Sequence, residues 1–187
     1  MKHLIIKTVI ISLSLIIAIS FIIIGLVSVI SPITIANASY RLGNYTISVK
    51  YTEKQYEKTK SFEDLALLVE RGITASDYEV VSKYSQSFLN NENFESYSSG
   101  KSGDYTNYIA NGYILSLYNL GHVDKSITTA LQYVDSEFSL PNPITTLVYV
   151  ASKNNDTETL IKISSELKKL EANDNIKNIL NQINKVV

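Results

Sequence analysis

A run of apolar residues without a single charge occupies the beginning of the chain. It extends from Thr8 to Ile30, and the first charged residue after Lys7 is Arg41. A helix of this length rises roughly 35 Å, which is enough to cross the ~30 Å hydrocarbon core of a bilayer. Helices of soluble proteins are rarely apolar on every side over such a length. We therefore expect a transmembrane helix over residues 8–31.

The charges that precede this segment indicate its orientation. Lys2, Lys7 and the amino terminus lie before it, and the positive-inside tendency then favours a cytoplasmic N-terminus. Residues 1–7 would form a short cytoplasmic segment, membrane lipid would surround residues 8–30, and residues 32–187 would form an extracytoplasmic domain. The expected location is the cell membrane, with a single pass.

A cleaved signal peptide is the alternative, because Ala36 and Ala38 precede Ser39 in an A-x-A pattern. The apolar run is longer than the roughly 7–15 residues typical of a signal peptide, which favours a retained anchor. Cleavage after Ala38 would instead release a secreted protein. Both interpretations place the rest of the chain outside the cytoplasm.

A helix–turn–helix pattern recurs four times after this segment. Its turns align at Gly43, Ser76, Gly121 and Asn154. The first two turns are 33 residues apart, as are the last two, and this spacing is typical of helix–turn–helix repeats. The middle pair is more widely spaced because the sequence NNENFESYSSGKSGD is inserted there. Its Gly/Ser-rich end predicts a flexible loop.

Each repeat is predicted to form two amphipathic helices. The sequence SFEDLALLVERGI places Leu65 and Leu68 on one face, with Ser61 as the N-cap. Pro32 either begins the first repeat helix, which would run to about Leu42, or kinks a continued membrane helix. The sequence NIKNILNQINKVV predicts a last amphipathic helix that caps the C-terminal end.

This pattern resembles the tetratricopeptide repeat family of helical solenoids, most clearly in YRLGNYTISVKYTEKQY, where Gly43 lies at the turn and Tyr45 two residues later. The resemblance covers residues 33–172 and implies stacked hairpins with a concave surface. Ser76 and Asn154 depart from the glycine of the family pattern. The expected fold is all-α: an N-terminal transmembrane helix, a short α-solenoid of tetratricopeptide-like repeats and a C-terminal capping helix. Other paired-helix repeats and an irregular helical bundle stay open as alternatives.

No residue pattern in the sequence indicates catalysis. The chain has no cysteine, which excludes disulfides, thiolate nucleophiles and cysteine-ligated metals. Its two histidines, His3 and His122, lie in no metal-binding spacing. A net charge of −1 and the lack of a Lys/Arg-rich block argue against nucleic acid as a partner. We expect no enzymatic activity, no cofactor and no metal.

One predicted helix face close to the membrane segment is basic. Lys50, Lys54 and Lys58 recur every four residues and therefore lie along one side of a helix. Such a face can rest on anionic lipid, at about 1 kcal/mol for each charge near the surface. The alternative is a solvated face that pairs locally with Glu53 and Glu57.

Tyrosine is the most distinctive residue type, with thirteen copies and no tryptophan. Tyr45 and Tyr78 occupy positions where a repeat buries an aromatic ring, so we expect them in the core. Tyr97, Tyr105 and Tyr108 flank the predicted loop and are predicted to be exposed, because tyrosine gives a large contact area at low entropic cost.

The first helix of each pair should line the inner surface of the solenoid. Its outward positions give the candidate partner-binding residues, which are Glu63, Glu70, Asn107, Tyr108 and Asn111. An acidic, amide-rich groove favours a basic or amide-rich segment of another envelope protein or peptide. We therefore expect a membrane-anchored, extracytoplasmic module that mediates protein–protein interaction without catalysis. A protein that binds cell-wall or surface glycan through tyrosine and asparagine side chains is the alternative.

Overall fold

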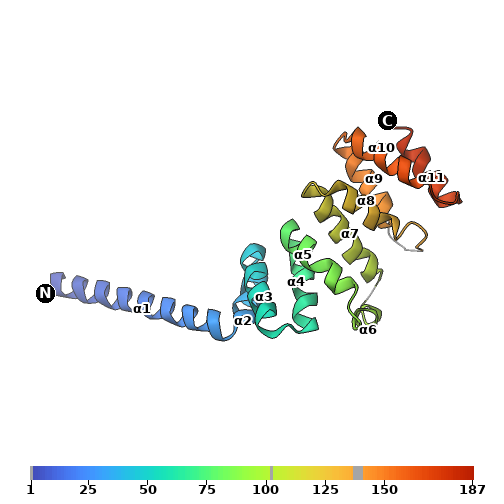
Figure 1. The fold of residues 1–187 in the computed structure, drawn as a ribbon. Helices are drawn as coiled ribbons and strands as arrows, with labels where there is room; N and C mark the ends of the chain where they lie inside the picture. The colour runs from blue at the N-terminus through green and yellow to red at the C-terminus, as the bar shows by residue number, and fades with distance from the viewer. Residues whose placement is uncertain (1, 102, 137–140) are drawn as a thin grey trace. The chain divides into compact units, whose positions relative to one another are not determined.

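The computed structural model describes residues 2–101, 103–136 and 141–187. All regular structure in these ranges is helical, in eleven helices (Figure 1). The predicted all-α class is therefore confirmed. The chain divides into two compact units, a first unit of Met1–Asp64 and a second unit of Leu65–Val187. The predicted domain boundaries at residues 7 and 31 stay predictions.

The first unit begins with the long helix α1 (Lys2–Ile30). Within it, Val9–Ile30 is long and apolar enough to cross a membrane, with a mean hydropathy of 3.0. A soluble-core helix of this composition would be mostly buried, whereas none of this span is buried within the protein. Length, composition and exposure thus agree with a helix that needs an apolar environment from outside the chain.

The rest of the first unit is a hairpin of α2 (Pro32–Arg41) and α3 (Tyr45–Thr59). Pro32 lies in the first turn of α2, so the prediction that it begins a new helix is confirmed. The buried residues of this hairpin are small, and they are Pro32, Ala36, Ser48, Val49 and Thr52. Small side chains allow the two helix backbones to approach closely.

Helix α4 (Phe62–Ala75) begins at the end of the first unit and continues into the second. The amide of Asp64 donates to Ser61 Oγ at 3.2 Å, which confirms Ser61 as the N-cap. The helices that follow are α5 (Tyr78–Leu89), α6 (Phe94–Ser99), α7 (Tyr105–Asn119), α8 (Val123–Leu131), α9 (Pro143–Lys153), α10 (Thr157–Leu167) and α11 (Asp174–Ile183). Hairpins α4/α5, α7/α8 and α9/α10 are connected by short turns. Helix α7 packs on α5, and α9 packs on both α7 and α8.

The insertion contains a short helix that the sequence analysis did not predict. Residues 94–99 form α6, and the ring of Phe94 is buried against Phe88 with 5.1 Å between the ring centroids. The rings of Phe94 and Tyr97, 5.1 and 6.1 Å from that of Phe88, attach the insertion to α5, because packed aromatic rings remove a large apolar area from water.

The four hairpins turn in the same way. The residues with positive φ at the turns are Gly43, Ser76, Gly121 and Asn155. In each turn the next amide donates to a carbonyl five residues earlier, as from Asp77 to Gly72 and from Asp156 to Ala151, both at 2.9 Å. This is the Schellman arrangement, which satisfies carbonyls at the end of the first helix. The fourth turn therefore centres on Asn155, and the alignment on Asn154 was wrong by one residue.

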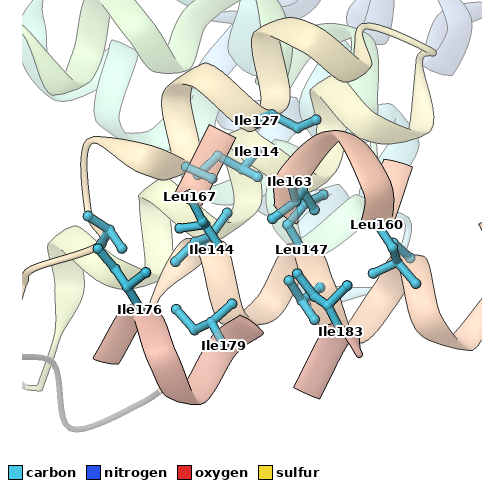
Figure 2. Close-up of a cluster of buried hydrophobic side chains, with 14 residues drawn as sticks. Ile114, Ile127, Ile144, Leu147, Leu160, Ile163, Leu167, Ile176, Ile179 and Ile183 are labelled. Carbon is cyan, nitrogen blue, oxygen red and sulfur yellow. The ribbon is translucent and has the colours of Figure 1, made fainter. Parts of the chain in front are cut away.

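A cluster of buried apolar side chains lies at the C-terminal end of the second unit (Figure 2). Helices α9 and α10 contribute fully buried side chains, which are Ile144, Leu147, Leu160, Ile163 and Leu167. Helix α11 adds Ile176, Ile179 and Ile183, which lie on the face that the sequence predicts to be apolar. The last helix thus covers apolar surface of α9 and α10 that would otherwise face water.

Candidate functional site

Glu70 is the centre of a polar cluster formed by α4, α6 and the start of α7. Its Oε1 accepts hydrogen bonds from Tyr105 Oη at 2.6 Å and Tyr97 Oη at 3.3 Å. Lys101 Nζ lies 3.1 Å from the same oxygen and forms an ion pair with it. Three donors therefore converge on one carboxylate oxygen and fasten the insertion to α4. We call Glu70, Tyr97, Lys101 and Tyr105 the Glu70 cluster.

Aromatic rings surround this cluster. The Tyr105 ring is stacked on Phe94 with 6.3 Å between centroids and lies edge-on to Tyr97 at 5.8 Å. Lys101 Nζ is 4.4 Å from the centroid of the Tyr97 ring, a cation–π distance. The side of the cluster away from solvent is therefore apolar, which strengthens the hydrogen bonds to Glu70.

The electrostatics of the Glu70 cluster keep its groups in their donor forms. Burial, followed by the hydrogen bond to Glu70, raises the pKa of Tyr105 far above its usual value near 10. The hydrogen bond with Tyr97 and the contact with Glu70 raise the pKa of Lys101 despite some loss of solvation. A neutral phenol and a charged ammonium are the states that bind a carboxylate, so the cluster acts as a tether. Neither shift would prepare a proton-accepting base at neutral pH.

A second polar contact joins α7 to the segment before α9. Asn107 is fully buried and its Nδ2 donates to the Pro141 carbonyl at 3.2 Å. Asn111 Nδ2 donates to Asn107 Oδ1 at 2.9 Å and to the same carbonyl at 3.3 Å. Both asparagines thus fix the entry to α9, whose N-cap is Asn142.

The predicted partner-binding residues therefore differ in what they offer. Glu63 is exposed and belongs to the first unit, and Tyr108 is exposed on α7. Glu70 and Asn111 are half-buried, and both already bind other residues of the chain. The expectation that Asn107 points outward is wrong, because buried polar contacts to the next hairpin outcompete solvent there. Whether any of the five binds a partner stays a prediction.

The tyrosine predictions were largely reversed. Tyr45 and Tyr78, expected in the core, are 40% and 38% exposed, whereas Tyr105, expected at the surface, is only 8% exposed. Tyr97 is half-buried, and only Tyr108 is exposed as predicted. Tyr105 is buried because α6 packs on α5 and the Phe94 ring of α6 stacks on the Tyr105 ring.

A pocket of about 360 Å³ lies on the opening helices of three consecutive hairpins of the second unit. Its walls come from the ends of α4, α7 and α9 and from the start of α5, and its lining includes Ile73, Tyr78, Leu115, Asn119, Val150 and Asn154. Apolar side chains form one part of its lining, and a tyrosine and two asparagines supply polar groups. We call this the hairpin pocket.

Two glycines that line the hairpin pocket allow its walls to approach. A Cβ atom at Gly112 would lie 2.5 Å from Ile73 Cδ1, and one at Gly72 would lie 2.9 Å from Val81 Cγ2. This pocket was not predicted from the sequence. The signal was present, because glycine is disfavoured in helix interiors and is retained there where a neighbour packs closely.

No protein-family model matches this chain, and no curated protein matches its sequence. Inference on function therefore rests on the residues and their geometry.

Proposed function

We propose that this chain is a membrane-anchored helical-repeat module whose hairpin pocket binds a segment of another envelope protein, without catalysis. The observation that carries the proposal is the hairpin pocket itself, which draws residues from three successive hairpins. A surface assembled from several repeats is the usual binding surface of helical solenoids. The cell membrane, with an N-terminal cytoplasmic end, is the location that this proposal assigns.

The packing of the second unit supports a tetratricopeptide-like arrangement. Helix α9 contacts both helices of the preceding hairpin, and α10 contacts α8, so each hairpin rests on the one before it. The Schellman turns recur at every hairpin. Repetition of both the turn and the packing is what a solenoid requires, whereas an irregular bundle requires neither.

The chemistry of the hairpin pocket favours an extended segment with an apolar anchor residue. Ile73, Leu115 and Val150 provide an apolar lining for one side chain. Asn119 and Asn154 can pair with backbone groups of an extended chain, because a primary amide both donates and accepts hydrogen bonds. A lining that combines apolar and amide side chains resembles the composition of a peptide-binding site.

Glycan is the second candidate ligand class, and the placement of Tyr78 favours it. This residue is 38% exposed and lines the hairpin pocket together with Asn119 and Asn154. An exposed aromatic face offers an apolar surface for stacking, and amides supply hydrogen bonds.

A photo-crosslinking experiment on the full chain in its native membrane separates these possibilities. A photoreactive residue at Leu115 in the hairpin pocket should give one protein adduct, whereas the same residue at Asn178, exposed on α11, should give none. Filling the pocket with Leu115→Trp should lower partner affinity by roughly tenfold, or about 1.4 kcal/mol. Equal adducts from both positions would contradict the proposed pocket.

The glycan candidate has its own readout. Retention of the full chain on purified wall polymer, abolished by Tyr78→Ala and unchanged by Tyr149→Ala, would favour glycan over protein. Tyr149 is a matched control because it is exposed on α9 and is not among the pocket residues.

The membrane anchor is tested separately: the chain should resist extraction by high salt and alkali and dissolve in detergent.

A further inference from the structure

A lysine of α3 contacts the end of the apolar helix α1. Lys58 Nζ donates to the carbonyl of Ile30, the last residue of α1, at 2.9 Å. The last carbonyls of a helix have no partner within it and carry the negative end of its dipole, so a lysine is favourable there. This contact holds one end of α3 at the level where α1 ends.

The position of Lys58 has a consequence once α1 crosses a membrane. Val9–Ile30 is the apolar span, so the Ile30 carbonyl marks the depth at which the chain leaves the hydrocarbon. A side chain 2.9 Å from this carbonyl lies at the level of the lipid headgroups. Lysine is favourable at this level, because its ammonium reaches headgroup oxygens while its methylene chain stays in apolar surroundings.

Lys58 belongs to a stripe along one face of α3. Ile47, Tyr51, Lys54 and Lys58 follow one another at spacings of four, three and four residues, which keeps them on one side of a helix. We call these four residues the α3 stripe. Ile47, Lys54 and Lys58 are exposed, and Tyr51 is half-buried with Lys54 Nζ 4.9 Å from its ring centroid.

The stripe differs from the basic face predicted by sequence. At about 100° per residue, Lys50 lies roughly 70° from the centre of the stripe and only about 20° from Glu57. Lys50 therefore shares its side of the helix with a carboxylate. The α3 stripe instead combines two lysines with an apolar and an aromatic residue, the residue types that gather at membrane interfaces.

We propose that the α3 stripe binds the anionic lipid headgroups of the membrane that α1 crosses. This inference rests on the proposed membrane anchor. Lys54 and Lys58 supply the charge, and Ile47 and Tyr51 enter the boundary between headgroups and acyl chains. The bilayer is favoured over an acidic protein because the contact between Lys58 and Ile30 places the stripe where the chain emerges from the bilayer.

The full chain allows a direct test, because it contains no cysteine and accepts a single labelled one. Ile47→Cys places an environment-sensitive fluorophore on the α3 stripe, and Thr46→Cys places it on exposed neighbouring surface roughly 110° away. Each labelled chain is reconstituted into vesicles of neutral phosphatidylcholine, or of phosphatidylcholine with about a third anionic phosphatidylglycerol. The fluorescence and its loss to an aqueous quencher are then measured at low salt.

The label at residue 47 should shift to shorter wavelength and resist quenching in the anionic vesicles, and the label at residue 46 should not. Lys54→Gln should lower the equilibrium constant for binding of the α3 stripe to anionic lipid roughly fivefold, since each lysine near an anionic surface contributes a factor of this size. Lys50→Gln, the matched control, should change it far less. Raised salt should weaken the effect as charges are screened.

Flotation of the vesicles before each measurement separates the two proposals. Chains that fail to float with either lipid would overturn both the membrane anchor and the lipid-facing stripe. Chains that float equally with both lipids, yet show no lipid-dependent protection at residue 47, would overturn the stripe alone. Protection that Lys50→Gln removes as effectively as Lys54→Gln would also overturn it, as would protection that appears only when an acidic protein is added.

Discussion

The first hairpin, α2/α3, and the last, α9/α10, share one turn but have different interiors. Both have a positive-φ residue and a Schellman hydrogen bond. Between α2 and α3 lie Ala36, Val49 and two buried hydroxyl side chains, whereas α9 and α10 bury five large aliphatic residues. The turn therefore specifies how the chain reverses, and the residues between the helices determine how much that reversal is stabilised.

This difference is energetic as well as geometric. Burying a large aliphatic side chain contributes about 1.5–3 kcal/mol, whereas Ala36 and the hydroxyl residues Ser48 and Thr52 contribute little apolar area. The Ser48 hydroxyl is buried and has no hydrogen-bond partner in the part of the chain that the structure describes. We therefore expect the first hairpin to be stabilised by its surroundings, namely α1 and, in our proposal, the lipid surface.

Truncating a buried side chain should have the largest effect on stability, and the loss should be greater in the last hairpin than in the first. Ile163→Ala, in the C-terminal core, should lower the free energy of unfolding by about 2–5 kcal/mol. Val49→Ala, in the first hairpin, removes two methyl groups and should cost about 1–2 kcal/mol. Hydrogen exchange of the full chain in detergent, resolved by segment, measures both. Equal losses of protection in the two hairpins would contradict the contrast between their interiors.

Replacing a glycine by alanine should have the next largest effect on stability, and the cause of the destabilisation should differ between the two units. Gly112→Ala places a Cβ against Ile73 and should cost about 1–3 kcal/mol, which the second substitution Ile73→Ala should partly restore. Gly43→Ala places alanine at φ +74° with nothing within 4 Å of its Cβ, so backbone strain of about 1 kcal/mol is expected. Thermal unfolding of single and double variants measures this coupling. Lack of rescue at Gly112 would mean that close packing is not the cause.

Acid should destabilise the last hairpin, because the N-cap residue of α10 is a carboxylate. The first hairpin should not respond in this way, because the equivalent cap of α3 is an amide. Hydrogen bonds from the Thr159 side chain and amide, and from Tyr118, hold the pKa of Asp156 below its usual value near 3.8. A lowered folded pKa means that this stabilisation is complete above pH 4–5 and decreases as the pH falls towards the folded pKa. The cap of α3 is Asn44, which does not titrate.

The measurement is amide protection of α10 and α3 between pH 6 and pH 3, corrected for intrinsic exchange. Asp156→Asn should remove the acid sensitivity that the cap adds to α10, and Asp156→Ala should cost about 1 kcal/mol at neutral pH. Undiminished acid sensitivity of α10 in Asp156→Asn would show that another carboxylate causes it.

The smallest expected effect is a gain in stability. The third turn has His122 at the N-cap of α8, and its side chain makes no cap hydrogen bond, unlike Asp77 and Asp156 at the same position of their turns. His122→Asp should supply this bond and stabilise α8 by about 0.5–1 kcal/mol. Thermal unfolding at pH 7 should show a higher midpoint, and no change would mean that the first amides of α8 are already satisfied by water.

Much of the fold could be predicted from the sequence because helices and turns are local. The apolar period of α11 and the N-cap Ser61 each depend on residues a few positions apart. The glycine turns at Gly43 and Gly121 were visible for the same reason. The fourth turn was misplaced because Asn154 and Asn155 have the same side chain, and only the backbone φ shows which one adopts the left-handed conformation.

The site was harder to predict because its contacts join distant residues. Glu70 appeared to be an outward acid, yet its partners lie 27 to 35 positions later, in and after an insertion that looked unstructured. The burial of Asn107 depends on the Pro141 carbonyl, 34 positions away. A helix face alone does not show which side a later segment covers. Local patterns therefore specified the hairpins, and long-range packing determined which of their polar residues stay accessible.

The common turn also has a consequence for the speed and order of folding. Each hairpin joins helices that are adjacent in the sequence through a few residues, so its two helices meet with little loss of chain entropy. Chains dominated by such short-separation contacts have low contact order and fold quickly. In the repeat arrangement that we propose, folding can nucleate at one hairpin and grow by adding the next. Assembly should start in the C-terminal hairpin with its aliphatic interior, and α2/α3 should become ordered last.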